Sequence, residues 1–441
     1  MDLHLVLDPA LGLRDGLERA LREAIGSGRL APGGPLPSTR ELAAELGMAR
    51  GTVSRAYEHL TAEGLLVARR GSGTRVADAR PAPPARVRSA PWTTLPPFPG
   101  FDLRPGMPDL SAFPRAAWLA STRRVLREVP SAALGYGDRA GHHLLREALA
   151  AYLGRARGVI ASADHIVVCA GYTQALRLLG RVLRRHGATA VAFEDPAPPD
   201  FPDLVESAGL ATVRVPVDGE GLVVGALPED VGAVVVTPAH QYPLGVTLAP
   251  RRRAALLATG VLVVEDDYDG EFGAAAGSLQ GLAPGRVVYT GTASKSLAPA
   301  LRLAWMAVPD ALLGPLREVM RYDESPVNAL DQLVLADLIT SGALDRHLAA
   351  SRRRYRRRHD RLVEALGPLP AGGLHAVVRL AEGEQEVLAR LHAAGVACDA
   401  LSGYYADPEN APGGLVIGYA TPPEHAFGPA LTALTGVLAR R

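Results

Sequence analysis

Lys295 is the residue whose chemistry stands out most in this sequence, because it is the one lysine among 441 residues. All the other basic side chains apart from histidine are arginines. An arginine cannot be deprotonated in a protein, whereas a lysine amine with a lowered pKa is a nucleophile that forms an imine with an aldehyde. The sequence therefore indicates a reactive amine at Lys295. The alternative is a surface lysine that survived by chance.

The residues on either side of Lys295 are suited to hold a reactive group. The segment 287–289 (VVY) predicts a short buried strand, and 290–294 (TGTAS) predicts a turn that carries small hydroxyl side chains, including Thr292. Such a turn just past a strand can hold an aldehyde and a phosphate. Arg302 follows Lys295 by seven positions and adds a permanent positive charge.

Two other predicted strands end in residues that would complete the same site. The strand at 166–169 leads into AGYT (170–173), which opens a helix, and free N–H groups at a helix N-terminus can hold a phosphate. The strand at 261–264 leads into EDDYD (265–269). Its four acidic side chains would repel one another unless some had cationic partners, and a protonated pyridine nitrogen is such a partner.

An amine, a carboxylate for a ring nitrogen, and an arginine with helix amides for a phosphate are what pyridoxal 5'-phosphate requires. We therefore predict this cofactor. An ordinary Rossmann-like domain with an acidic loop is the alternative, and it leaves the single lysine unexplained. We predict no metal site, because the sequence has no His/Cys cluster at zinc spacing.

The elements that position these residues alternate between strands and helices. The predicted strands are 165–169, 190–193, 233–236, 261–264 and 286–289, and helical patterns between them include 174–185 and 251–257. Continuous apolar strands that alternate with helices predict an α/β fold with a mostly parallel sheet covered on both faces. Ligands bind such sheets at the carboxyl ends of the strands, where the residues above lie.

A proline-rich segment divides the chain. Residues 79–100 contain seven prolines, which predicts an extended, semi-rigid spacer. We predict a first domain at 1–78, a linker at 79–102 and a second domain at 103–441.

The first domain has the element order of a winged helix-turn-helix. Helices are predicted at 13–25, after the capping box at Ser38–Glu41, and at 50–62, and a hairpin is predicted from strands at 65–67 and 74–76. The second helix of such a pair enters the major groove by its N-terminal end, and the wing contacts the DNA backbone or minor groove. The predicted DNA-contacting residues are Ser38, Thr39, Arg40, Arg50, Gly51, Thr52, Ser54, Arg55, Arg69 and Arg70. A small helical interaction domain with solvated arginines is the alternative.

The composition fits an intracellular globular protein. The chain is 48% hydrophobic and 21% charged, and no apolar run reaches the about 18–20 residues of a membrane span. The first residues lack the basic and apolar regions of a signal peptide. Two distant cysteines, Cys169 and Cys398, predict free thiols and a reducing cytoplasm. The net charge of +1 neither favours nor excludes nucleic acid.

These motifs together resemble the MocR subfamily of GntR-type bacterial regulators, in which a winged helix-turn-helix is fused to a fold-type I aminotransferase-like domain that binds pyridoxal phosphate. The resemblance covers nearly the whole chain. It is carried by LPSTRELAAELGMARGTVSRAYEHLTAEGLL, YGDRAGHHLLREALAAYLGRARGV, VTPAHQYPLGVTL, VVEDDYDGEF and VYTGTASKSLAPALRL.

The resemblance assigns roles to residues of this sequence. Lys295 matches the Schiff-base lysine, Asp266 the aspartate that faces the pyridine nitrogen, and Tyr268 the tyrosine near the ring oxygen. Gly171, Tyr172, Thr173, Thr292 and Arg302 fall where this fold binds phosphate. Tyr136 matches a tyrosine that reaches the partner subunit's active site, and His240 matches a residue near the ring. The resemblance thus implies a head-to-tail homodimer with shared sites.

Two positions depart from the family pattern. Pro198 stands where relatives often have an aromatic residue that stacks on the ring, and Gly414 stands where aminotransferases have an arginine for the substrate carboxylate. Both departures argue against a physiological transaminase activity, although residual chemistry of that kind stays open. They also argue against an amino acid held as in the GABA-responsive relative.

We therefore expect a cytoplasmic transcriptional regulator that binds operator DNA and senses a small amine or amino-acid-like effector through Lys295. One alternative is a regulator of vitamin B6 synthesis that senses pyridoxal phosphate itself. Another is an aminotransferase with an accessory DNA-binding domain. A run of seven arginines at 351–361 (SRRRYRRRHDR) predicts a solvated helix face, with a second DNA-contacting surface as the alternative.

Overall fold

The protein is described by a computed structural model that covers residues 5, 7, 12–69, 73–77, 98–273, 277–323, 326–370, 373–380 and 383–439. The chain forms two compact units, Met1–Pro96 and Pro97–Arg441. Most of the predicted linker and the wing residue Arg70 lie outside the described residues, as does the side chain of Arg69. Within the described part, no helix combines the length and the apolar character needed to cross a membrane.

The N-terminal unit has the predicted winged helix-turn-helix fold. Its elements are α1 (Leu13–Gly26), α2 (Thr39–Glu45), α3 (Arg50–Ala62), β1 (Leu66–Arg69) and β2 (Gly73–Val76), and the two strands pair antiparallel. The capping box at the start of α2 is complete, since Glu41 N donates to Ser38 Oγ at 3.2 Å and Ser38 N donates to Glu41 Oε2 at 2.8 Å. Leu17, Leu42 and Val53 lie in the core that joins the three helices.

The second unit contains an eight-stranded sheet in the order β4-β11-β10-β9-β8-β5-β6-β7. In that order the strands are Ile166–Cys169, Ala304–Ala307, Val287–Thr292, Leu262–Asp266, Ala233–Val236, Ala190–Asp195, Ala211–Asp218 and Gly221–Leu222. From β10 to β6 all neighbours are parallel, while β11 runs antiparallel to both β10 and β4, and β7 is antiparallel to β6. The prediction of a mostly parallel sheet is confirmed.

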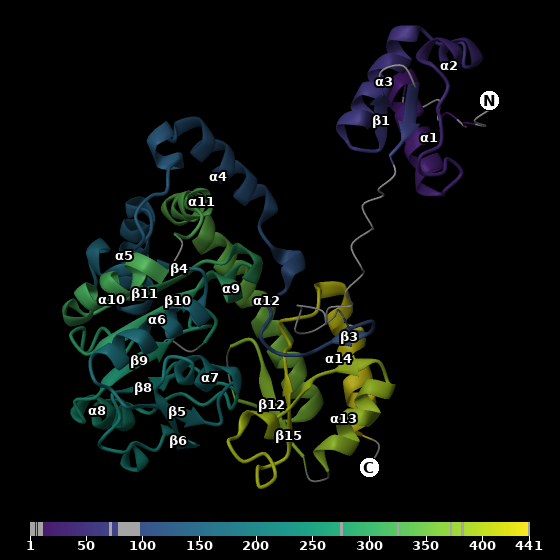
Figure 1. The fold of residues 1–441 in the computed structure, drawn as a ribbon. Helices are drawn as coiled ribbons and strands as arrows, with labels where there is room; N and C mark the ends of the chain where they lie inside the picture. The colour runs from purple at the N-terminus through teal and green to yellow at the C-terminus, as the bar shows by residue number, and fades with distance from the viewer. Residues whose placement is uncertain are drawn as a thin grey trace. The chain divides into compact units, whose positions relative to one another are not determined.

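Helices cover both faces of this sheet (Figure 1). Along β10, Val288 packs with α6 and α10 on one face, whereas Tyr289 packs with α5 and α11 on the other, as the two-residue period of a strand requires. The covering helices are α5 (His143–Arg157), α6 (Tyr172–Arg185), α7 (Asp200–Glu206), α8 (Pro250–Ala258), α10 (Asp310–Asp323) and α11 (Ala329–Thr340), and α4 (Arg115–Glu128) packs on α11.

The C-terminal part of this unit forms a smaller three-stranded antiparallel sheet in the order β12-β15-β14, beside α13 and α14 (Figure 1). The bounds are β12 Ala376–Arg379, β14 Asp399–Ala400, β15 Gly414–Ile417, α13 Glu384–Ala393 and α14 Glu424–Leu438. The long helix α12 (Ala343–Leu366) precedes it, and β13 (Val396–Ala397) pairs with β3 (Phe101–Asp102). Short 3-10 turns occur at Leu110–Ala112, Ser131–Leu134, Ala163–His165, Val224–Ala226, Pro299–Leu301 and Ser402–Tyr404.

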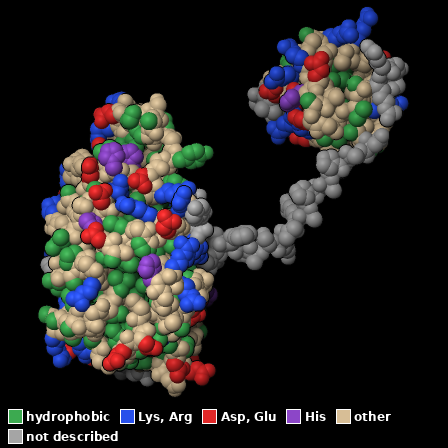
Figure 2. Space-filling model, turned by 60° about the vertical axis from the view of Figure 1, so that its left-hand side comes forward, with side chains coloured by type: hydrophobic (Ala, Val, Ile, Leu, Met, Phe, Trp, Pro, Cys, Tyr) green, Lys and Arg blue, Asp and Glu red, His purple; other side chains and the backbone are tan. Residues whose placement is uncertain are grey.

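Two sequence-based predictions need correction. Residues 290–292 extend β10 and do not form a turn, and the short helix α9 (Ala293–Ser296) then begins. The arginine run on α12 is only partly solvated, because Arg358 is 2% exposed whereas Arg353, Arg356 and Arg357 are exposed. On the face of the molecule that Figure 2 shows, acidic and basic side chains are intermixed, in keeping with the net charge of +1.

Candidate functional site

A cavity of about 690 Å³ opens where the central strands of the large sheet end. The last residues of β9 and β10 line it, and so do residues of α9, which follows β10. Strand β4 leads into the N-terminus of α6, which also lines the cavity. The lining includes Gly171, Tyr172, Thr173, Asp266, Tyr268, Thr292, Lys295 and Arg302. Three stretches of sequence that were predicted to form one site therefore do meet in space.

Lys295 lies on α9, directly after β10. The Thr292 hydroxyl accepts a hydrogen bond of 3.0 Å from Ser294 N and so caps α9, a structural role in addition to the predicted one. The Lys295 ammonium donates to the carbonyl of Gly106. Burial lowers the pKa of Lys295, and the nearby carboxylates of Asp266 and Asp269 oppose that shift. A lowered pKa increases the neutral, nucleophilic fraction of the amine.

Asp266 is buried and makes no ion pair within the described part of the chain. Burial raises its pKa to about 8, Asp267 adds to the rise, and Lys295 opposes it. The adjacent Asp267 is different, because Arg157 Nε lies 2.6 Å from its Oδ2 and Tyr289 donates to it at 2.8 Å. Asp266 is thus the carboxylate of this acidic run that is free to meet a protonated ring nitrogen.

A positive region lies in another part of the cavity. Gly171 precedes α6 with a φ of 138°, and a Cβ at that position would lie 2.9 Å from Arg302 Nη2. Glycine is therefore needed for the Arg302 side chain to approach the first turn of α6. Arg302 itself has a φ of 51° and forms no ion pair with a described residue. An unpaired guanidinium beside a helix N-terminus is suited to a phosphate.

The residues present fit pyridoxal 5'-phosphate. Its lining has a carboxylate and a guanidinium that form no ion pair with the described residues, and an amine with a lowered pKa. The Tyr172 hydroxyl is also buried there, close to the Asp266 carboxyl, and makes no hydrogen bond of good geometry to any described residue. Buried polar groups without partners are rare in proteins, so these groups are better explained by a bound polar molecule than by the fold alone.

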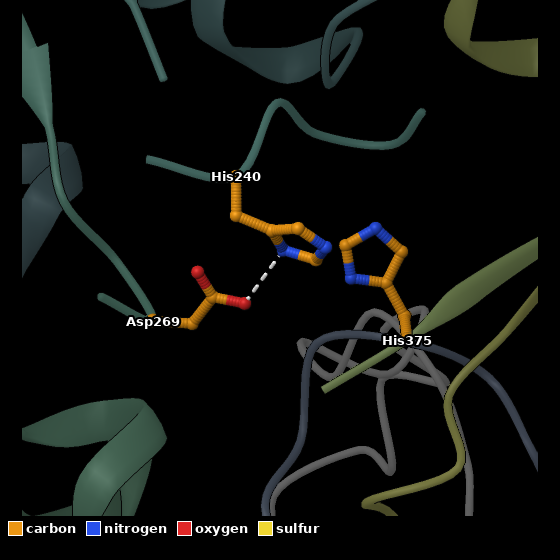
Figure 3. Close-up of side chains that lie close together, drawn as sticks. All are labelled: His240, Asp269 and His375. Carbon is orange, nitrogen blue, oxygen red and sulfur yellow. Dashed lines mark hydrogen bonds and ion pairs between the residues drawn. The ribbon is translucent and has the colours of Figure 1, made fainter. Parts of the chain in front are cut away.

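His240, Asp269 and His375 form a buried cluster (Figure 3), and Tyr268 packs against both histidine rings of it. The Tyr268 hydroxyl donates to the His240 carbonyl at 3.0 Å, and His240 Nδ1 lies 2.9 Å from Asp269 Oδ2 and 3.0 Å from the Tyr268 oxygen. His240 does not line the cavity. It was predicted to lie near the ring, and in the structure it contacts Tyr268 instead.

The same cluster could offer three metal-ligand atoms within 4.8 Å of one another, and hydrogen bonds already engage Asp269 and one nitrogen of each histidine. His375 Nε2 lies 2.9 Å from the Pro243 carbonyl, and His240 Nδ1 is shared between Asp269 and Tyr268. Burial, with His240 adding to the effect, lowers the pKa of His375 to about 3, so His375 is neutral at pH 7. We interpret the cluster as a support that fixes the orientation of Tyr268.

Tyr136 and Gly414 lie away from the cavity lining. Tyr136 is 94% exposed, and its predicted role concerns a partner subunit. Gly414 lies on β15 and its amide donates to Glu384 Oε2 at 2.9 Å. Pro198, the other departure from the family pattern, does line the cavity.

Sequence reasoning missed several lining residues, including Glu194, Tyr242, Asp399 and Tyr404. Burial raises the pKa of Glu194 to about 7, and the carboxylate accepts a hydrogen bond of 2.6 Å from the Thr237 hydroxyl. None of these residues occurs in a spacing that is typical of a ligand site. Tyr242, Asp399 and Tyr404 reach the cavity because elements far apart in sequence pack together, whereas Glu194 directly follows the predicted strand 190–193.

In the N-terminal unit, the predicted DNA-contacting side chains gather at the N-terminal ends of α2 and α3. Arg50 Nε lies 3.4 Å from Thr39 Oγ1, which brings the two helix starts together. Arg40, Arg50 and Arg55 are exposed, and Arg55 Nε donates to the Gly51 carbonyl at 3.3 Å. Ser38, Gly51, Thr52 and Ser54 are exposed or half-buried at the same ends.

Two family patterns match the sequence. Residues 13–76 match "Bacterial regulatory proteins, gntR family", and residues 108–410 match "Aminotransferase class I and II".

Regulatory proteins and an aminotransferase structure are similar to this chain. The HTH-type pyridoxine biosynthesis transcriptional regulator PdxR of Corynebacterium glutamicum is 34% identical over 95% of this chain and 94% of its own length. The probable rhizopine catabolism regulatory protein MocR of Rhizobium meliloti is 32% identical over 81% of this chain and 77% of its own. The crystal structure of an archaeal alanine:glyoxylate aminotransferase superposes with a TM-score of 0.71 and 25% identity, and covers 78% of this chain and 91% of that one.

Proposed function

The chain belongs to the GntR family of bacterial regulatory proteins, in the MocR-type group that carries an aminotransferase class I and II domain, and we propose that it is a transcriptional regulator whose sensor site holds pyridoxal 5'-phosphate. The observation that carries the proposal is the meeting of Lys295, Asp266 and Arg302 in one cavity. A small amine is the proposed effector, and operator DNA is the proposed partner of the N-terminal unit.

Each residue has a proposed part in holding the cofactor. Lys295 would bond the aldehyde carbon, Asp266 would accept a hydrogen bond from the ring nitrogen, and Tyr268 would stand by the ring oxygen. Arg302 and the first turn of α6, with Thr173, would hold the phosphate. When bound, the cofactor supplies an electrophilic carbon that exchanges one amine for another, so an effector amine would release the Lys295 side chain.

A second candidate is a sensor of pyridoxal phosphate itself. It is favoured by the similarity to the pyridoxine biosynthesis regulator over nearly the whole chain. In that case occupancy of the cavity is the signal. A ligand shifts a conformational equilibrium only by its differential affinity for the two states. The two candidates therefore predict that different ligands, an amine or pyridoxal phosphate, change the affinity for DNA.

We further propose the domain boundaries 1–78, 79–102 and 103–441, and a head-to-tail homodimer in which Tyr136 reaches the partner's cavity. Binding to operator DNA requires access to the chromosome, so the proposal includes a cytoplasmic location. The arginines at the helix ends of the N-terminal unit, with Arg69 and Arg70 of the wing, are the proposed DNA contacts.

Visible absorbance of the purified chain tests the cofactor. We expect a band of a lysine-bound pyridoxal compound in the wild type and its loss in Lys295→Ala and in Lys295→Arg. The arginine variant is the matched control, because it keeps the positive charge but cannot form an imine. Absence of a band in the wild type, even after added pyridoxal phosphate, would overturn the proposal.

Operator binding then separates the two candidates. If the effector is an amine, DNA affinity changes when an amine is added to the cofactor-loaded protein. If pyridoxal phosphate is the signal, DNA affinity changes between the cofactor-free and loaded protein and amines add nothing. Keto-acid production at about 1 per second or more would instead indicate a true aminotransferase.

A further inference from the structure

One wall of the cavity has no part in the proposed cofactor contacts. It is formed by residues of the smaller sheet and the loop that follows it, together with Tyr242. The lining residues on this wall are Cys398, Asp399, Ala400, Gly403, Tyr404 and Tyr242. An amine that reached Lys295 would have this wall available for its other end.

Asp399 is the charged group of this wall. Its Oδ2 accepts a hydrogen bond of 2.7 Å from the Tyr404 hydroxyl, and the Tyr242 hydroxyl lies 3.2 Å from that of Tyr404. The two phenols stack edge to face at 5.5 Å between ring centroids. Asp399 is therefore held in one position by groups that themselves face the cavity.

The charges around Asp399 do not cancel. Arg104 is the nearby cation, and it already forms a bidentate pair with Asp102 at 2.9 and 2.6 Å. Two carboxylates therefore share one guanidinium. Burial raises the pKa of Asp399, and Arg104 and the Tyr404 hydrogen bond oppose that rise while Asp102 adds to it. A cation in the cavity would relieve this excess of negative charge.

The other charged groups of the described lining do not offer a site for an anion at this wall. Lys295 and Arg302 are its only cations, and the proposed function uses both for the cofactor. Of the other acids, Glu194 is satisfied by Thr237 and Asp200 is exposed at the start of α7. A free carboxylate on the ligand would thus be repelled by Asp399 and would have no cation of this wall to pair with.

We propose that the effector carries a second positive group and that Asp399 binds it, so that the ligand class is a diamine or a guanidino-amine rather than an amino acid. This inference rests on the proposed function, because it takes Lys295 to meet the first amine. The faces of Tyr242 and Tyr404 can add cation–π attraction to the same group. Asp399 is then the residue that determines which amine the site selects.

Calorimetric titration of the cofactor-loaded full chain tests this inference. The probes are putrescine, butylamine and γ-aminobutyrate, which share a four-carbon chain. The far end of the chain is a cation in putrescine, a methyl group in butylamine and a carboxylate in γ-aminobutyrate. A second set of probes uses the five-carbon chain of cadaverine. We expect the diamine to bind about tenfold or more tighter than the monoamine, a difference of about 1.4 kcal/mol. The amino acid is expected to bind most weakly.

Asp399→Asn should bring the diamine to the affinity of the monoamine and leave the monoamine unchanged. Asparagine keeps the shape and can still accept the Tyr404 hydrogen bond, so the variant removes charge alone. Asp407→Asn is the matched control, since Asp407 is exposed and lies outside the lining. Equal affinities of diamine and monoamine in the wild type, or a preference for the amino acid, would overturn the inference.

The outcomes separate failure of this inference from failure of the proposed function. If the wild type has no absorbance band, the proposed function fails as well. If the band is present and responds to butylamine without any diamine preference, only the role of Asp399 is wrong. If the band is present and no probe binds, both the inference and amine sensing are overturned, and the pyridoxal phosphate sensor stands.

Discussion

At the scale of single residues, Asp266 shows how a residue placed to bind a ligand lowers the folding stability of the ligand-free protein. Its carboxyl is buried and forms no ion pair with a described residue, and burial raises its pKa to about 8 although the Lys295 charge opposes the rise. A carboxyl whose pKa is higher in the folded than in the unfolded chain stabilises the fold below its usual pKa near 4. That contribution is lost as the pH rises toward 8, because the buried charge then has to form.

We therefore expect the cofactor-free protein to lose stability relative to Asp266→Asn as the pH rises from 6 to 8. The expected size is about 1–2 kcal/mol over this window, because each pH unit changes the free energy of unfolding by up to about 1.4 kcal/mol. Urea unfolding at several pH values measures it. Glu265 and Glu271, with pKa values raised to about 7 by burial, are present in both proteins and largely cancel in the difference, whereas the charge of Glu194 acts on Asp266 and is part of the measured effect.

Cofactor loading provides the control for this prediction. A protonated ring nitrogen would favour the charged form of Asp266, so the difference between wild type and variant should shrink when pyridoxal phosphate is bound. A difference that does not depend on pH in the cofactor-free protein would contradict the raised pKa.

Apart from Glu194, which directly follows the predicted strand 190–193, the sequence predicted the site residues that follow strands and missed those from other parts of the chain. Lys295, Asp266 and Gly171 could be found because parallel strands present their carboxyl ends at one edge of a sheet. Asp399 and Arg157 could not be found in this way, because each lies more than a hundred residues away in sequence from the site residues that it approaches. His240 was placed near the ring, yet its position behind Tyr268 depends on the packing of His375, which no local pattern indicates.

At the scale of elements, α12 shows the limit of reading a charged run as a solvated face. Tyr355 and Arg358 lie on the buried side of the helix. Arg358 Nη2 pairs with Asp109 at 3.0 Å and Glu424 at 2.8 Å, and its Nη1 donates to three backbone carbonyls after β15, the nearest being that of Pro422 at 2.8 Å. Periodicity alone cannot indicate this, since every arginine counts as polar.

Arg358→Ala should therefore destabilise the second unit by about 3–5 kcal/mol, because it leaves a buried carboxylate and several carbonyls without a donor. Arg357→Ala is the matched control, since Arg357 is exposed on the neighbouring position of α12, and it should change the free energy of unfolding by less than about 0.5 kcal/mol. Tryptophan fluorescence during urea unfolding reports on Trp118 and Trp305 in this unit. Equal effects of the two substitutions would contradict the structural role of Arg358.

At the scale of the whole molecule, α4 is an element that the chain alone does not bury. Of its residues only Ser121 is fully buried, while Leu119 and Leu126 are 50% and 57% exposed and lie seven positions apart on one face. The helix is attached to α11 through Arg124, which pairs with Asp337. Exposed leucines at this spacing are typical of a surface that another protein covers.

We expect the covering protein to be a second copy of this chain, since a homodimer is part of the proposed function. Leu119→Glu combined with Leu126→Glu should convert a dimer into a monomer, because two charges would be buried without partners. Sedimentation velocity measures the change, and Leu282→Glu is the control, because Leu282 is 66% exposed in the loop between β9 and β10.

The loss of the dimer should also weaken the binding of the cofactor and of operator DNA. Cofactor affinity should fall if Tyr136, which is 94% exposed in a single chain, completes the partner's cavity. Operator affinity should fall because two tethered DNA-binding units gain from effective concentration, and separate ones do not. A double variant that stays dimeric would move the interface away from α4, and one that becomes monomeric with unchanged cofactor affinity would remove Tyr136 from the site.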